Sequence, residues 1–265
     1  MPLLNKAVAF FLRQYMKLQQ ILSYVRKAIE DYHMIEEGDR IAVGISGGKD
    51  SLTLLYALSS LRYFFPKKFE LYAVTVDLGF NNLDLSRVEE LCKGLNVPYH
   101  IIKTDIAQIV FDERKESNPC SLCAKMRKGA LYYWLDDHNI NKVAYAHHKD
   151  DVVETMMLSM IYEGRFHTFS PVTFLNRTGI TVIRPLIYIR EADIVGFVNA
   201  NNVPVVKSPC PADKTTQREY VKTVLRDINL KAPGVKERMF TAIKNSNIKG
   251  WNGNGESDEL SRPTE

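Results

Sequence analysis

The feature of this sequence that most constrains its fold is an alternation of short apolar runs with segments of helical length. The first two runs, Arg40–Ile45 (RIAVGI) and Glu70–Leu78 (ELYAVTVDL), are typical of buried strands. Strands that alternate with helices form βαβ units, so we predict an α/β fold in which helices cover both faces of a parallel sheet. The other predicted strands are 99–103, 142–146 and 182–188, and the predicted helices are 51–61, 83–95, 120–137, 151–162 and 191–201.

Helical segments flank the predicted sheet on both sides. Residues 5–33 carry apolar side chains every three or four positions, as in an amphipathic helix. Near the other end, Thr216-Gln-Arg-Glu219 is a capping box that opens a helix to about Asn229, and Pro233 precedes a second helix to Lys244. We therefore predict four parts: a helical segment 1–38, the α/β domain 39–206, a helical segment 207–249 and a disordered tail 250–265.

Composition excludes several classes of protein. The 265 residues, 45% of them hydrophobic, can bury a full core, which excludes overall disorder and a small disulfide scaffold. No apolar run approaches the roughly 18 to 20 residues that cross a bilayer, and the first residues do not form a secretory signal, so we predict a cytoplasmic protein with no membrane partner. The net charge of +4 is mild, but residues 207–249 carry ten basic and four acidic side chains, against 24 and 23 in residues 1–206.

A loop with the sequence SGGKDS, residues 46–51, lies between the first predicted strand and the first helix. Two glycines let the backbone approach a ligand closely, the following helix directs its N–H groups toward it, and Lys49 adds a positive charge. The loop is not a Walker loop, because the four-residue gap between its glycines is absent. Glycines in such loops also serve simply to turn the chain, so the residues alone leave a phosphate site and a plain turn open.

At this position the loop resembles the PP-loop of the N-type ATP pyrophosphatases. The resemblance implies a Rossmann-like, adenine nucleotide alpha hydrolase-like fold, and ATP cleaved between its α- and β-phosphates to adenylate a substrate oxygen. It also implies that Lys49 and Asp50 are catalytic and that Asp50 is a ligand of Mg²⁺. The residues implied to bind the nucleotide are Ser46, Gly47, Gly48, Lys49, Asp50 and Ser51, with Asp77, His147 and Arg184 farther along the chain.

A second polar motif, HHKDD at residues 147–151, follows a predicted strand, at the edge where open α/β sheets bind ligands. Asp151 and Glu154 would also make an ordinary acidic first turn of a helix. Beside a PP-loop the motif resembles the second ATP and metal element of the same family, which implies that Asp151 is catalytic and a second ligand of Mg²⁺. Arg184-Pro-Leu resembles a further family element, with Arg184 against the phosphates.

The four cysteines divide by their surroundings. Cys120 and Cys123 lie at the start of a predicted helix beside basic residues, which predicts lowered thiol pKa values. Cys210 stands alone between two prolines, and Cys92, between leucines, is predicted to be a core residue. From spacing alone, a zinc site with a fourth ligand, a redox pair and a [4Fe–4S] cluster with one iron not bound by protein all stay open.

Taken together, the PP-loop, CSLC, HHKDD, RPL and a late cysteine resemble the tRNA 2-thiocytidine synthetases over about residues 33–239. The resemblance implies that the C2 oxygen of a tRNA cytidine, at position 32, is adenylated and replaced by sulfur. It implies a [4Fe–4S] cluster on Cys120, Cys123 and Cys210, with ATP and Mg²⁺, a sulfur donor such as a cysteine desulfurase or free sulfide, and a homodimer formed through the N-terminal helix. Some members carry CxxC at the late position, where this chain has Cys210 alone, so a fourth thiol there takes no part.

A basic stripe lies on the helix predicted to begin at Thr216, where Arg218, Lys222 and Arg226 recur every fourth residue. Such a stripe is often only a solvated face. Because it follows Cys210 within the basic segment, we predict that it binds tRNA phosphates together with Lys214.

Three other functions stay open from the sequence. One is a PP-loop tRNA 2-thiouridine synthetase, and another is a thiolase that uses a persulfide on Cys120 or Cys123 without iron. The third is a zinc-stabilised tRNA-binding or redox-sensing protein that is not an enzyme.

Overall fold

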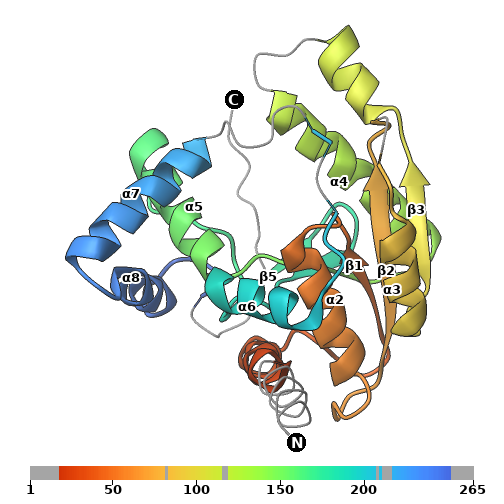
Figure 1. Cartoon of the computed structure of the whole chain (residues 1–265), viewed down its shortest axis with the longest axis horizontal. Helices are drawn as coiled ribbons and strands as arrows, with labels where there is room; N and C mark the ends of the chain where they lie inside the picture. The colour runs from red at the N-terminus through yellow and green to blue at the C-terminus, as the bar shows by residue number, and fades with distance from the viewer. Residues whose placement is uncertain (1–17, 81–82, 115–118, 207–208, 211–216, 252–265) are drawn as a thin grey trace, which may run out of the picture.

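A single mainly parallel sheet organises the part of the chain that the computed structural model describes, residues 18–80, 83–114, 119–206, 209–210 and 217–251 (Figure 1). The strand order is β3-β2-β1-β4-β6-β5, and β5 alone runs antiparallel to its neighbour. The predicted parallel α/β sheet is therefore confirmed. Its strands are β1 (Asp39–Gly44), β2 (Phe69–Asp77), β3 (Tyr99–Lys103), β4 (Lys142–Ala144), β5 (Val172–Leu175) and β6 (Ile180–Ile183).

Helices pack on both faces of the sheet because each central strand is apolar on both sides. In β1, Ile41 and Val43 join the larger core with α2, whereas Ala42 between them joins a smaller core with Leu131 and Leu135 of α4. Figure 1 shows α3 beside β2 and β3, with α7 and α8 on the opposite side of the molecule. The helices are α2 (Lys49–Leu61), α3 (Ser86–Gly94), the π-helix η1 (Gln108–Glu113), α4 (Pro119–Asp137), α5 (Lys149–Tyr162), α6 (Glu191–Asn201), α7 (Gln217–Lys231) and α8 (Val235–Lys244).

The two helices that carry the polar motifs begin earlier than the sequence predicts. α2 begins at Lys49 and α5 at Lys149, each two residues before its predicted start. Lys49, Asp50 and Asp151 are therefore first-turn residues, positioned by a rigid element at the carboxyl edge of the sheet.

One predicted strand is wrong in its position. We predicted a strand over 182–188, but β6 ends at Ile183, and the chain turns where Pro185 has no N–H to donate to a sheet. The antiparallel edge strand β5 was not predicted. It pairs with β6 through a turn in which Gly179 adopts a φ of +66°.

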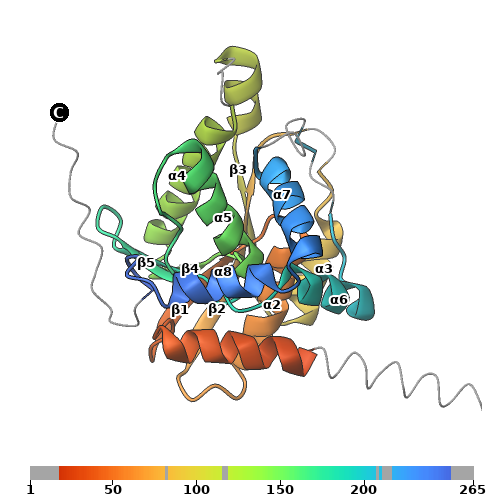
Figure 2. The ribbon, with the colours of Figure 1, turned by 90° about the vertical axis from the view of Figure 1, so that its left-hand side faces the viewer.

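The flanking helices share the core of the sheet. The helix over residues 18–31 lies along the bottom of the molecule in Figure 2 and buries Leu22, Val25 and Ile29 in the same cluster as α2. Residues 5–17 of the helix predicted over 5–33 lie outside the described residues. Val221 and Leu225 of α7 belong to the same cluster, so both flanking segments contribute side chains to the larger core.

The tail predicted from Gly250 begins too early. Trp251 is only 2% exposed, with its ring 6.2 Å from that of Tyr32 and 5.6 Å from that of Phe240. Burial of an aromatic ring of this size stabilises the fold, and replacing a buried tryptophan by alanine typically lowers the free energy of unfolding by about 3 to 5 kcal/mol. Residues 252–265 lie outside the described part of the chain, and among the described residues no helix is long and apolar enough to cross a membrane.

Candidate functional site

The loop between β1 and α2 is held by two glycines and two serine hydroxyls. Gly47 adopts a φ of +78°, and a Cβ there would lie 3.0 Å from the Cβ of Val206, so only glycine fits. Gly48 donates its N–H to Ser46 Oγ at 3.3 Å, and Ser51 Oγ donates to the Gly48 carbonyl at 3.0 Å. The loop therefore presents the N-terminus of α2, with its unpaired amides, in a fixed shape suited to an anion.

Lys49 lies between two carboxylates. Its Nζ is 2.9 Å from both carboxylate oxygens of Asp50 and 2.9 Å from Glu191 Oε1 at the start of α6. Burial lowers the pKa of Lys49, but the charges of Asp50 and Glu191 outweigh it and leave the pKa raised. Sequence reasoning missed Glu191, because an acidic residue at the first position of a helix indicates by itself only an interaction with the helix dipole.

His148 joins the two aspartates implied to bind metal. It caps α5: Asp151 donates its backbone N–H to His148 Nδ1 at 3.4 Å, and His148 donates its own to Asp151 Oδ2 at 2.9 Å. On its other side, His148 Nε2 is 3.8 Å from Asp50 Oδ1. The HHKDD motif and the PP-loop therefore meet at one place. The carboxyl-edge cluster, as we call this group, consists of Lys49, Asp50, His148, Asp151 and Glu191.

Asp150 fixes the cluster to the C-terminal helices. Its Oδ2 accepts the backbone N–H of Glu191 at 2.8 Å, and its Oδ1 lies 2.9 Å from Lys236 Nζ on α8. Burial raises the pKa of Asp150, but these two donors outweigh it and leave the pKa lowered, so the charged form ties α5, α6 and α8 together.

Glu154, one turn after Asp151 on α5, is a fully buried acid, which the sequence placed in an acidic helix turn and in the second family motif without a role of its own. Its Oε2 lies 3.2 Å from Arg218 Nη1, and its buried Oε1 has no hydrogen-bond partner among the described residues. Burial raises the pKa of Glu154 to about 7, although Arg218 opposes that shift. Removing one partner of a buried ion pair typically costs about 3 to 5 kcal/mol, so the two side chains depend on each other.

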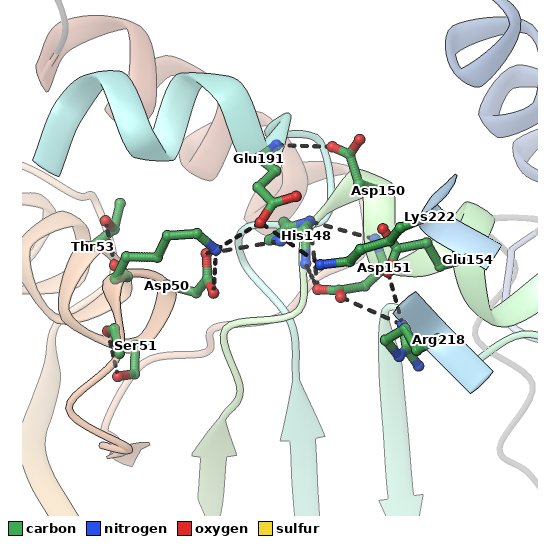
Figure 3. Close-up of polar contacts among 12 residues, drawn as sticks. Asp50, Ser51, Thr53, His148, Asp150, Asp151, Glu154, Glu191, Arg218 and Lys222 are labelled. Carbon is green, nitrogen blue, oxygen red and sulfur yellow. Dashed lines mark hydrogen bonds and ion pairs between the residues drawn. The ribbon is translucent and has the colours of Figure 1, made fainter. Parts of the chain in front are cut away.

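The basic stripe predicted to bind tRNA divides in two. Arg218 and Lys222 point toward the acidic side chains of α5 and α6, as Figure 3 shows. Arg226 is 71% exposed and lies 3.9 Å from the exposed Asp227. Lys214, which we predicted to join the stripe, lies outside the described residues.

The remaining residues implied at the nucleotide surround the carboxyl ends of the strands. Asp77 ends β2 and accepts the backbone N–H of Gly79 at 3.0 Å. His147 packs against Phe169, and burial together with the charge of Arg184 lowers the pKa of His147 to about 3. Arg184 is itself buried and donates to the Ser170 carbonyl and Thr173 Oγ1, so it braces the β5–β6 hairpin. Their contact with the nucleotide stays a prediction.

The three cysteines implied to bind iron influence one another. Burial raises the pKa of the Cys123 thiol, Arg127 lowers it, and the charges of Cys210 and Cys120 raise it further. The predicted lowering of the Cys123 pKa is therefore wrong, because partial burial and neighbouring like charges outweigh the basic side chains. Cys92 is buried in the core as predicted, which raises its pKa to about 11, and none of the four cysteines forms a disulfide.

These thiols fit a metal cluster by their chemistry. Thiolate sulfurs suit iron or zinc, and a positively charged metal would oppose the burial and the neighbouring thiols that raise the pKa of Cys123. Within the described residues, no three cysteine, histidine or acidic side chains already stand at metal-ligand spacing. The three cysteines therefore provide suitable sulfur ligands, but among the described residues they do not yet surround a metal position.

Two comparisons of sequence identify relatives of the chain. Residues 16–228 match the family model of the PP-loop domain. The tRNA-cytidine(32) 2-sulfurtransferase of Citrifermentans bemidjiense is 37% identical over 229 residues, which are 85% of this chain and 90% of that protein. The protein of the same name from Geotalea uraniireducens is 38% identical over 229 residues, 85% of this chain and 91% of that protein.

A solved structure supports the fold. The U34-tRNA thiolase NcsA from Methanococcus maripaludis, with its [4Fe-4S] cluster, matches 86% of this chain and 78% of its own with a TM-score of 0.71. Its identity is 23%, so this likeness concerns the fold alone. With the PP-loop, the carboxyl-edge cluster and the full-length sequence relatives taken together, the chain belongs to the PP-loop family, in the branch of the tRNA-cytidine(32) 2-sulfurtransferases.

Proposed function

We propose that this chain is an ATP-dependent tRNA sulfurtransferase that replaces the C2 oxygen of cytidine 32 with sulfur, giving 2-thiocytidine. Two observations carry the proposal together: the phosphate loop meets a carboxylate cluster at one edge of the sheet, and Cys120 and Cys210 both act on the pKa of the Cys123 thiol. The relatives at 37% and 38% identity bear names that describe this reaction.

The phosphate loop would hold ATP by charge and backbone amides. Lys49 provides a fixed positive charge, and the N-terminus of α2 directs its N–H groups to the same place. The C2 oxygen of cytidine would attack the α-phosphorus, form a P–O bond and release pyrophosphate, which takes the electron pair of the broken bond. Adenylation makes the C2 oxygen part of AMP, a far better leaving group.

Asp50 and Asp151 would hold Mg²⁺ with the nucleotide. Mg²⁺ prefers carboxylate and phosphate oxygens, and these two carboxylates flank the same histidine. When bound, the ion would neutralise phosphate charge. Their present partners, Lys49 for Asp50 and Arg218 for Asp151, keep the carboxylates in place at the edge.

Cys120, Cys123 and Cys210 would hold a [4Fe–4S] cluster, which would supply the sulfur-carrying position. Three protein ligands leave one iron open to a small ligand. Val206 donates its N–H to the Gly47 carbonyl at 2.9 Å, so the phosphate loop contacts the chain four residues before Cys210. The third thiol is thereby tethered near the nucleotide.

The partners of the enzyme follow from this chemistry. The sulfur would come from a donor such as a cysteine desulfurase or from free sulfide, and the tRNA substrate implies a cytoplasmic location. We also propose a homodimer formed through the N-terminal helix. Mass measurement of the purified protein in solution tests the dimer.

The test is mass analysis of nucleosides from unmodified tRNA incubated anaerobically with iron-loaded protein, ATP, Mg²⁺ and sulfide. We expect ATP-dependent 2-thiocytidine that maps to position 32. Appearance of 2-thiouridine alone, or stoichiometric zinc without iron in the active protein, would overturn the proposal. Lys49→Met is the control, because it removes the charge of the phosphate loop and leaves all cysteines intact.

A further inference from the structure

Two basic side chains of α7, each about one-third exposed, are directed to the carboxyl edge. Arg218 Nη1 is 3.6 Å from Asp151 Oδ1, and Arg218 Nη2 donates to Thr155 Oγ1 at 3.2 Å. Lys222 lies one turn later on the same face. Figure 3 shows both side chains directed to the side chains of α5 and α6.

Lys222 and the phosphate-loop lysine share one acceptor. Glu191 Oε1 is 2.9 Å from Lys49 Nζ and 3.9 Å from Lys222 Nζ. The positive charges of Lys49 and Lys222 therefore lie on either side of one carboxylate oxygen of Glu191. Any polyanion bound by Lys49 would lie within the field of Lys222.

Glu154 holds Arg218 at this edge. It is completely buried, and it directs one oxygen to Arg218 while the other has no partner among the described residues. Burying a carboxylate in this way adds little to stability. An orienting role explains it better, because the pair holds a planar guanidinium, which binds phosphate oxygens in a bidentate manner, beside Asp151 of the carboxyl-edge cluster.

We propose that Arg218 and Lys222 bind the β- and γ-phosphates of ATP, so that α7 is part of the nucleotide site, and that Glu154 is the positioning residue for Arg218. The proposal rests on ATP as the nucleotide of the proposed function. It differs from the sequence prediction, which gave these side chains to tRNA. When ATP binds, Arg218 and Lys222 would exchange their carboxylate partners for phosphate oxygens, so each cation stays paired. Arg226 stays on the outer surface, where it is available for other contacts.

The test measures binding of α,β-methylene-ATP and of AMP, with Mg²⁺ and without tRNA. Arg218→Ala alone would strand the charge of Glu154, so the variant is the pair Arg218→Ala with Glu154→Gln, which removes both charges from the buried site. We expect the dissociation constant for the triphosphate to rise about tenfold, as for loss of one charge-assisted contact, with that for AMP unchanged. Lys222→Ala should act in the same direction, and Glu154→Gln alone should weaken the triphosphate less than the pair.

Arg226→Ala is the matched control, since it removes the same charge from the same helix, and triphosphate affinity should stay at the wild-type value. Unchanged triphosphate affinity in the pair variant, an equal loss for AMP, or a loss confined to tRNA binding would overturn the proposal. Lys49→Met separates the two levels of inference. If it also leaves triphosphate affinity intact, the phosphate loop itself does not bind ATP and the proposed function fails. If Lys49→Met weakens binding and the pair does not, only the role of α7 fails.

Discussion

The carboxyl-edge cluster and the three cysteines differ in how their charges are compensated. At the cluster, Lys49 lies between the carboxylates of Asp50 and Glu191, and the His148 ring lies between Asp50 and Asp151. At the cysteines, burial and the neighbouring Cys210 and Cys120 raise the pKa of the Cys123 thiol, and Arg127 lowers it.

Only one of the two regions is stabilised by partners within the chain. The nucleotide edge has its shape from side-chain pairs within the chain, whereas Cys123, whose pKa is raised, needs a metal to be stabilised as a thiolate. Nucleotide binding and metal binding should therefore be separable by mutation, although both are needed for sulfur transfer.

The largest effect is expected from Cys123→Ser. Loss of one of three thiol ligands should abolish iron retention and bring 2-thiocytidine formation below detection, while affinity for α,β-methylene-ATP stays at the wild-type value. Iron analysis and calorimetry measure the two properties. Cys92→Ala, in the core, should retain iron. Full thiolation by an iron-free Cys123→Ser protein would contradict the assignment.

Lys49→Met should act on the other region. Loss of the phosphate-loop charge should lower thiolation about 100-fold, the usual size of losing one preorganised charge contact in a transition state. The iron content should equal that of the wild type. Thiolation assays and iron analysis on one preparation check both points, and loss of iron together with activity would show that the two regions are not separable.

A smaller effect is expected for the exposed part of the stripe. Arg226→Ala should weaken tRNA binding a few-fold and reduce the slope of log affinity against log salt by roughly 0.9, as for one lost phosphate contact. Filter binding across a salt series measures the slope. Arg177→Ala, exposed on the β5–β6 turn, serves as control, and an equal slope for both variants would exclude Arg226 from the tRNA contact.

The smallest effect concerns His147, the first residue of the HHKDD motif, which packs against Phe169. Because the folded pKa, about 3, is below the ordinary 6.5, its contribution to stability is full above pH 6.5 and is lost as pH falls toward 3. Between pH 7.5 and 6 the loss should stay below about 1 kcal/mol. Denaturant unfolding should show a flatter pH dependence in His147→Leu, and identical profiles would mean that His147 is solvated.

The parts of the site that were predictable from sequence are local. The phosphate loop and HHKDD are each a run of consecutive residues between a strand and a helix. Predicting that strand and that helix is therefore enough to predict where Lys49, Asp50 and Asp151 lie. Glu191 and Glu154 were not recognised, because their partners Lys49 and Arg218 are far away in sequence. The direction of Arg218 depends on how α7 packs against α5, which helical periodicity does not specify.

The fold shows the same division. Central strands were predicted from their apolar runs, whereas the edge strand β5 is only four residues long, too short to show a periodic pattern although Val172, Thr173 and Phe174 favour strands. Trp251 lies in a segment whose composition is typical of disorder, and only its contacts with Tyr32 and Phe240 explain its order. The Cys123 pKa depends on burial and on Cys210, and neither is visible from the spacing of CSLC.

The most direct test of the account follows the C2 oxygen itself. A tRNA that carries ¹⁸O at C2 of cytidine 32 is incubated with iron-loaded protein, ATP, Mg²⁺ and sulfide, and the released AMP is analysed by mass spectrometry. We expect one ¹⁸O atom in each AMP formed and one 2-thiocytidine for each AMP, because the adenylated C2 oxygen leaves with the phosphate. Unlabelled AMP alongside 2-thiocytidine would contradict adenylation of the base at the nucleotide edge.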